Sequence, residues 1–206
     1  EAMGGKRIEA CTSPEARALP TLDMALRRIL RDHVDDMGVS MEMRLVSGHG
    51  GDVRARIYVP QNDLATAARP MILFLHGGFF VLGDVDNFDA SPRALAARTG
   101  AVVVSAHYRQ APEHRFPAAH EDAWAAWQWL LEHAGSLGGD PKRAAIVGEG
   151  SGANLAVNVA LRAKAEGKPM PLHLGLVTPM AAMLFDLPSH KHNAATFPYS
   201  TATLEW

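Results

Sequence analysis

The chain has a single cysteine, Cys11, among its 206 residues. One cysteine excludes an internal disulfide and a metal site built from a cysteine cluster. It also makes a reducing, cytoplasmic setting the expected location. Neither sign of charge dominates, because the formal net charge is −2. The chain therefore lacks the broad basic excess that holds nucleic acid through its phosphates.

Long apolar runs are also absent. The longest, residues 71–82, is interrupted by His76 and by two glycines. A membrane-spanning helix needs about 20 apolar residues, so no span is expected. The chain opens without the charged and then apolar segment of a signal peptide. Its hydrophobic share of 48% and charged share of 20% are those of a globular domain, not of a disordered chain.

The first half of the chain changes its hydrophobic period. Residues 14–37 carry an apolar stripe at helical spacing, which predicts an amphipathic helix. Residues 41–45 and 53–59 then alternate apolar and polar side chains. The segment His49-Gly50-Gly51-Asp52 between them has turn chemistry, so we predict an antiparallel hairpin.

The rest of the chain alternates continuous apolar runs with helical segments. The runs are residues 71–75, 101–104, 144–147 and 172–177, and the helical segments are 88–98, 118–134 and 152–165. Continuous apolar strands suit a parallel sheet that is covered on both faces. The alternation predicts an α/β fold with a mostly parallel sheet and flanking helices.

The segment 118–134 contains Trp124, Trp127 and Trp129. Three tryptophans could form an aromatic platform for a ligand. The preferred interpretation is a helix packed on the sheet, because buried aromatic side chains dominate the area of protein cores.

Two glycine-rich turns carry the candidate chemistry. The first, residues 76–80, follows a predicted strand and reads His-Gly-Gly-Phe-Phe. Paired glycines let backbone N–H groups converge on one point, where they can hold the negative oxygen of a tetrahedral acyl intermediate. An ordinary tight turn is the alternative. For His76 we favour a structural role over proton transfer.

The second turn, Gly148-Glu149-Gly150-Ser151-Gly152, lies between a predicted strand and a predicted helix. This is the place of the Gly-x-Ser-x-Gly nucleophile turn of the α/β hydrolases. A phosphate-binding loop is the alternative, but Glu149 puts a carboxylate in the turn and no Lys-Ser or Lys-Thr pair follows.

Three stretches together resemble the hormone-sensitive-lipase-like family of α/β hydrolases, the bacterial family IV carboxylesterases. Residues 76–79 resemble the His-Gly-Gly-Gly oxyanion loop of the family. Residues 108–119 are similar to its Tyr-Arg-x-Ala-Pro-Glu-x-x-Phe-Pro-Ala-Ala motif, and 148–155 to its Gly-Asp-Ser-Ala-Gly-Gly-Asn-Leu motif. The stretch 185–190 resembles the segment after the sixth strand of the family.

The resemblance implies an α/β-hydrolase fold and hydrolysis of short-chain acyl esters through a serine acyl-enzyme, with no cofactor and no metal. We expect an N-terminal helical cap region over residues 1–40, the hydrolase core over 41–180, and the start of a second cap segment over 181–206. The expected partners are a small-molecule ester and either a second copy of the chain or a C-terminal fragment.

The nucleophile motif departs from the family pattern. Matching Gly148, Gly152 and Asn154 to the motif places Gly150 where the family has its nucleophilic serine. Reading Ser151 as the nucleophile instead places Glu149 in the crowded position two residues before it. We therefore favour Gly150 as the nucleophile position and keep Ser151 as the alternative. The resemblance then assigns the oxyanion hole to Gly77, Gly78, Phe79 and Ser151, with His76 and Glu149 in support.

The acid and the histidine of a serine hydrolase follow the nucleophile in the order Ser, Asp or Glu, His. The family's later stretches that carry them have no match here, so we expect strands of the fold beyond residue 177 to be missing and the chain to be inactive as written. Without those strands, we expect the strand at 172–177 to be an exposed apolar edge. Asp186, His190 and His192 follow in the right order, but a solvated loop is the preferred interpretation. A ligand-binding protein on a hydrolase fold is the alternative function.

Overall fold

A computed structural model describes residues 6–19, 37–48, 50–61, 67–182, 186–195 and 200–205. Its strands are β1 (Val39–Gly48), β2 (Gly51–Pro60), β3 (Arg69–Leu75), β4 (Val102–Ala106), β5 (Gly139–Glu149) and β6 (Leu174–Val177). Its longer helices are α3 (Ala90–Thr99), α4 (Ala118–His133) and α5 (Ser151–Ala165). Its short helices are η1 (Ile8–Ala10), α1 (Ser13–Arg17), η2 (Gly135–Leu137), α6 (Pro188–His192) and α7 (Thr201–Glu205).

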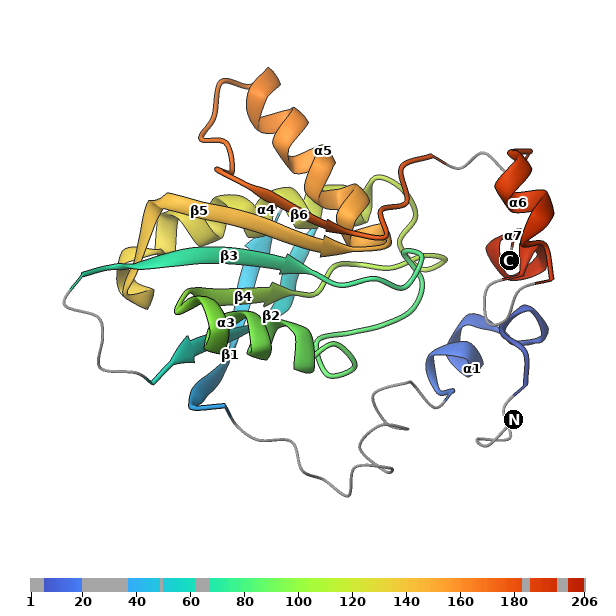
Figure 1. Ribbon diagram of the computed structural model, residues 1–206, viewed down its shortest axis with the longest axis horizontal. Coiled ribbons are helices and arrows are strands. Elements are labelled where there is room, and N and C mark those ends of the chain that lie inside the picture. Colours follow the sequence, from blue (N-terminus) through green and yellow to red (C-terminus); the bar gives the residue numbers. More distant parts are fainter. Residues whose placement is uncertain are drawn as a thin grey trace.

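The six strands form one sheet in the order β1-β2-β4-β3-β5-β6 (Figure 1). Strands β4, β3, β5 and β6 are parallel. The hairpin β1–β2 joins this parallel part antiparallel, through the pairing of β2 with β4. The predicted hairpin, the predicted α/β fold and the mostly parallel sheet are therefore confirmed.

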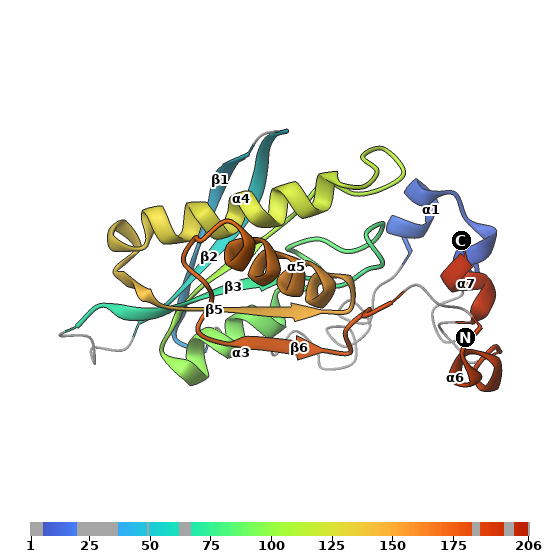
Figure 2. The same cartoon turned by 90° about the horizontal axis from the view of Figure 1, so that it is seen from above.

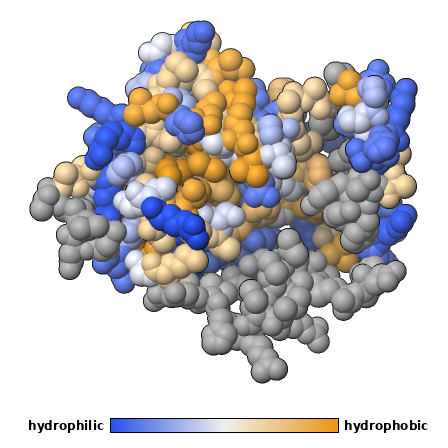
Figure 3. Space-filling model, in the orientation of Figure 1, coloured by the Kyte–Doolittle hydropathy of each residue, from blue (hydrophilic) through white to orange (hydrophobic). Residues whose placement is uncertain are grey.

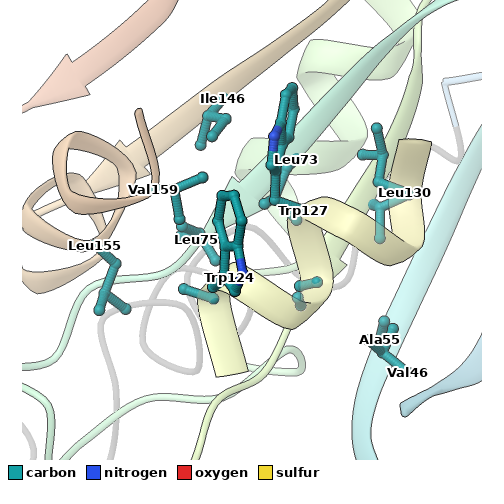
Figure 4. Packing of buried hydrophobic residues seen from close by; sticks show 14 of the residues in the cluster. Val46, Ala55, Leu73, Leu75, Trp124, Trp127, Leu130, Ile146, Leu155 and Val159 are labelled. Atoms are coloured by element: carbon teal, nitrogen blue, oxygen red, sulfur yellow. The ribbon is translucent and has the colours of Figure 1, made fainter. Parts of the chain in front are cut away.

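Two buried layers enclose the sheet. The larger one lies between the sheet and the helices α4 and α5, and the smaller one lies between the sheet and α3 (Figure 2). In the larger layer, Trp124 and Trp127 of α4 lie among Leu73, Leu75 and Ile146 of the sheet (Figure 4). Both indoles are at most 3% exposed. The packing role predicted for the tryptophan helix is confirmed, since these rings form core rather than an open platform.

The N-terminal segment differs from the predicted helix over 14–37. The described helix α1 ends at Arg17, and residues 20–36 lie outside the described residues. Pro20 accounts for the early end, because a proline disfavours helical backbone at the residue before it. In Figures 1 and 2, α1 lies with α6 and α7 beyond the carboxyl ends of the parallel strands.

The strand predicted at 172–177 is confirmed over its last four residues, and its predicted place at an exposed apolar edge is confirmed as well. Only Leu174–Val177 forms a strand, and β6 is an edge of the described sheet. Leu172, Leu176 and Val177 are exposed, and Figure 3 shows hydrophobic residues gathered over α5 and β6. In the described part of the chain, no helix is long and apolar enough to cross a bilayer.

Candidate active site

The strand β5 ends in a sharp turn at Gly150, and α5 begins at the next residue. Gly150 has φ 54° and ψ −114°, outside the regions that L-residues ordinarily occupy. The α/β hydrolases place their nucleophile in a strained strand-to-helix turn of this kind. Gly150 therefore holds the tip of such a turn, at the carboxyl edge of the sheet.

The glycines on either side of this tip are required by close backbone packing. A Cβ atom at Gly148 would lie 2.3 Å from the carbonyl oxygen of Gly152, and one at Gly152 would lie 2.0 Å from that of Leu75. Gly150 itself has room, because its Cβ would meet nothing nearer than the Cα of Gly77 at 3.8 Å. The crowded positions thus lie two residues before and two residues after Gly150.

Ser151 occupies a different place. Its side chain is fully buried, and its Oγ lies 3.3 Å from the hydroxyl oxygen of Tyr108. The Tyr108 hydroxyl donates its proton to the carbonyl oxygen of His76 at 2.9 Å, so Ser151 is the donor in the bond between the two hydroxyls. The Ser151 hydroxyl is therefore hydrogen-bonded to Tyr108, which in turn binds the backbone of His76, and it does not face solvent.

The loop after β3 lies against this turn. The Cα of Gly77 approaches the tip at Gly150, and a Cβ at Gly77 would lie 3.2 Å from the carbonyl oxygen of Glu149. Gly78, Phe79 and Phe80 all have positive φ, at 120°, 56° and 64°. Positive φ is a strained state for a bulky side chain such as phenylalanine. Phe79 occupies the position of the third glycine in the family's His-Gly-Gly-Gly oxyanion loop, and it has a positive φ that glycine adopts without strain.

The segment 108–113 braces this loop. Gln110 donates from its amide to the carbonyl oxygens of Leu82 and Gly83 at 2.7 and 2.9 Å. The N–H of Ala111 donates to the carbonyl oxygen of Phe80 at 2.9 Å. The Phe80 ring packs against the main core and stacks on His120. The motif that carries the family resemblance thus fixes the loop over the turn.

Arg17 joins the N-terminal segment to the same brace. Its guanidinium donates to the carbonyl oxygens of Val81 and Ala111, each at 2.8 Å. It also holds both carboxylate oxygens of Glu113, at 2.9 and 2.7 Å. This pairing lowers the pKa of Glu113 to about 2. Helix α1 is thereby attached beside the loop that faces Gly150.

His76 is fully buried, and its two ring nitrogens are both used. Its Nδ1 lies 2.7 Å from the carbonyl oxygen of Gly77, and its Nε2 lies 3.1 Å from Nδ1 of His107. Burial lowers the pKa of His76 to about 3, so the ring is neutral. A carbonyl can only accept, which places the proton of His76 on Nδ1 and leaves Nε2 to accept from His107. His76 thus fixes the backbone of its own loop.

Glu149 has a half-buried carboxyl whose pKa is raised by burial. Within the described residues its side chain makes no hydrogen bond, and its backbone carbonyl lies against Gly77. Asp186 and His192 are exposed, and His190, on α6, is partly so. Figure 1 shows α6 set apart from the sheet, beyond its carboxyl edge.

Sequence reasoning gave no role to four residues that support the site. Tyr108, Gln110 and Glu113 stood in a quoted motif, and Arg17 stood in no motif. The motif was the signal that could have found the first three. Arg17 lies more than ninety positions from Glu113, and only the folded chain brings them together.

Comparison with known proteins places this geometry in a family. The family model described as the alpha/beta hydrolase fold matches residues 72–206. Esterase LipI of Mycobacterium tuberculosis is 40% identical over 174 residues, which cover 82% of this chain and 54% of LipI. Ethyl acetate hydrolase of Pseudomonas putida is 32% identical over 86% of this chain and 56% of its own. The chain spans about half the length of these curated relatives.

A solved structure and a plant protein extend the comparison. The crystal structure of a thermostable esterase from Pseudomonas putida ECU1011 superposes with a TM-score of 0.85 at 32% identity, over 98% of this chain and 61% of that one. Gibberellin receptor GID1 of Oryza sativa is 36% identical over 68% of this chain and 46% of its own. The chain belongs to the hormone-sensitive-lipase-like family of α/β hydrolases, the bacterial family IV carboxylesterases.

Proposed function

We propose that the chain contains the oxyanion hole of a carboxylic-ester hydrolase site and has glycine at the nucleophile position. The chain as written therefore does not hydrolyse esters. The observation that carries the proposal is the positive-φ backbone of Gly150, a conformation strained for any residue with a side chain, between the two crowded glycines of the turn. Ser151 does not replace the missing nucleophile in this proposal, because its hydroxyl is buried and hydrogen-bonded to Tyr108.

The proposed chemistry needs a serine at position 150 together with an acid and a histidine. The histidine takes the proton of the serine, which attacks the ester carbonyl and gives an acyl-enzyme with loss of the alcohol. Water then attacks the acyl-enzyme and releases the acid. The N–H groups of Gly78, Phe79 and Ser151 stabilise the oxyanion in both steps, while Gly77 and His76 shape the loop.

The substrate class in this proposal is the short-chain acyl ester. The name of the relative ethyl acetate hydrolase supports a small ester. The segments 1–40 and 181–206 would form the cap over the acyl group. Arg17, which attaches α1 beside the oxyanion loop, supports the first of these.

The test is a pair of Gly150→Ser proteins. One is the present chain, and the other is a chimera that adds the remaining length of Esterase LipI. Members of a catalytic triad act as a unit, so serine alone should recover little. We expect hydrolysis of p-nitrophenyl acetate by the serine chimera, and almost none by the short variant or by the same chimera with Gly150. Full activity of the short variant would contradict the proposal and point to His76, His190 or His192 as the base.

A second candidate function is binding of a small ligand without turnover. The absent nucleophile favours it, and so does a receptor among the relatives, Gibberellin receptor GID1. Titration calorimetry with short-chain carboxylic acids separates the two. Binding by the unaltered chain that is lost in Phe79→Asp would support this candidate, and no heat of binding would remove it.

A further inference from the structure

The strand β1 is the second edge of the described sheet, opposite β6. It is ten residues long, and only Val39 and Val46 are buried. Met41, Met43 and Leu45 are exposed by 48%, 45% and 59%, and they share one face of the strand. Glu42 and Arg44 share the other face and form an exposed ion pair within the strand. A long edge with apolar side chains is a template for pairing with another strand.

The backbone N–H and C=O groups of β1 that point away from β2 belong to its odd-numbered residues, and they have no partner strand in the described sheet. The carbonyl oxygen of Arg54 accepts from the N–H of His107 on the β4 side, so it faces away from β1. Leu45 lies opposite Arg54 in the hairpin. Residues alternate between bonded and non-bonded positions in an antiparallel ladder, so the N–H and C=O of Leu45 point outward.

The other end of the hairpin gives the same alternation of residues bonded to β2 and residues pointing outward. The N–H of Gln61 donates to the carbonyl oxygen of Gly38 at 2.7 Å, which places the even-numbered residues of this strand on the β2 side. The pairing of β1 with β2 is regular from Val39 to Gly48. Met41, Met43 and Leu45 therefore present their backbone groups outward, as well as an exposed side chain each.

We propose that two copies of the chain associate through β1, antiparallel about a two-fold axis at Met43. This register sets Met43 opposite Met43 of the second copy, and Met41 opposite Leu45. It sets Glu42 opposite Arg44, and by symmetry Arg44 opposite Glu42. On one face of the joined sheet, Met41, Met43 and Leu45 of the two copies pack against each other, and two Glu–Arg pairs form on the other face. The two six-stranded sheets become one continuous sheet.

The backbone phase and the charge pattern agree on this register. Met43 is at an outward position, so the central pair exchanges hydrogen bonds. Glu42 and Arg44 are then at non-bonded positions, where opposing Cα atoms are only about 4.5 Å apart and side chains interact most closely. Figure 2 shows the hairpin β1–β2 extending past α4. The other edge, β6, has four residues and no charged side chain, so it selects no register.

Sedimentation equilibrium with charge reversals tests the proposal. Glu42→Arg and Arg44→Glu each turn two attractive pairs into two like-charge pairs, so each should raise the dimer dissociation constant about tenfold or more. The double variant Glu42→Arg/Arg44→Glu restores both pairs with their signs exchanged and should dimerise like the unaltered chain. Lys164→Glu, an exposed reversal on α5, is the matched control and should change nothing.

Cysteine cross-linking tests the register in a Cys11→Ser background. Opposing Cα atoms at a hydrogen-bonded pair are about 5.5 Å apart, within the reach of a disulfide. Met43→Cys should therefore give a covalent dimer on oxidation. Met41→Cys should not, because the two cysteines would lie about 14 Å apart along the strands. A chain that stays monomeric at all concentrations, single reversals without effect, a double variant that is not rescued, or equal cross-linking of both cysteines would each overturn the proposal.

Discussion

At the scale of single residues, Gly150 occupies a backbone state that few side chains tolerate. With φ 54° and ψ −114°, any other residue there stores strain of about 1–3 kcal/mol. We predict that Gly150→Ala lowers the free energy of unfolding by about this amount, although its Cβ finds space. The measurement is urea unfolding followed by circular dichroism. Gly135→Ala is the control, because Gly135 has ordinary φ and open space around it.

If Gly150→Ala and Gly135→Ala proved equally stable, the strain assigned to the turn would be absent. The turn would then be an ordinary connection, and Gly150 would no longer be preferred over Ser151 as the nucleophile position.

His76 gives a second residue-scale prediction, for pH. Burial lowers the pKa of His76 from 6.5 to about 3, and burial also lowers the pKa of His107. Between pH 6.5 and 3 the unfolded chain holds a proton on His76 that the folded chain does not. The contribution of His76 to the free energy of unfolding is therefore at its full value above pH 6.5. It falls as the pH drops below 6.5, with a limiting slope of about 1.4 kcal/mol per pH unit.

The prediction is measured as urea unfolding between pH 7 and 5, where most carboxylates stay ionised. His76→Asn keeps an amide donor near the carbonyl of Gly77 but cannot titrate, so its stability should vary less with pH than that of the unaltered chain. Parallel pH profiles for the two proteins would show that His76 is not held neutral in the fold.

At the scale of elements, the side chain of Arg17 links α1 to the loops of the site through four hydrogen bonds. We predict that Arg17→Ala speeds amide hydrogen exchange at Ala16, Ala18 and Leu19, whose N–H groups donate within α1 and its ends, because four hydrogen bonds from the guanidinium are lost. Arg17→Lys should rescue only part of the protection, since an ammonium cannot span the same acceptors. Lys6→Ala removes only an exposed ion pair and is the control. Unchanged exchange in Arg17→Ala would mean that α1 is held by other contacts.

Hydrophobic period alone predicts most of the elements in the described chain. The alternation in 41–45 and 53–59 predicts the hairpin, and the continuous runs at 71–75 and 144–147 predict β3 and β5. The helix predicted over 14–37 is a different case, because its described part ends at Arg17, before Pro20. Period predicts β6 as a strand but not its place at the edge, because an apolar run looks the same in a covered strand and in an edge strand. The missing match to the later strands of the family predicts the edge instead.

The site is predictable only where it is local in sequence. The spacing of Gly148 and Gly152 marks the turn, but only the crowding at Gly148 comes from a near neighbour, Gly152, whereas Gly152 itself is crowded by the distant backbone of Leu75. The brace from Gln110 to Leu82, and the clamp from Arg17 to Glu113, join distant segments. Nothing in the period or the spacing of the chain indicates such pairs, which arise only when the sheet brings the loops to one edge.

At the scale of the whole molecule, both glycine turns and the segment 108–113 that braces them lie together at the carboxyl ends of the parallel strands. The described scaffold is that of the esterase relatives, while the residue at the tip of the nucleophile turn has no side chain. We therefore predict a site that is shaped for an acyl oxyanion but has no group to form the acyl-enzyme.

The most direct test is to label the chain with a fluorophosphonate probe and to map the modified residue by peptide mass spectrometry. The Gly150→Ser chimera with Esterase LipI serves as the positive control, and Ser151→Ala as the negative one. We predict no modification of Ser151 in the unaltered chain. Stoichiometric modification of Ser151 that disappears in Ser151→Ala would contradict it and make Ser151 the nucleophile.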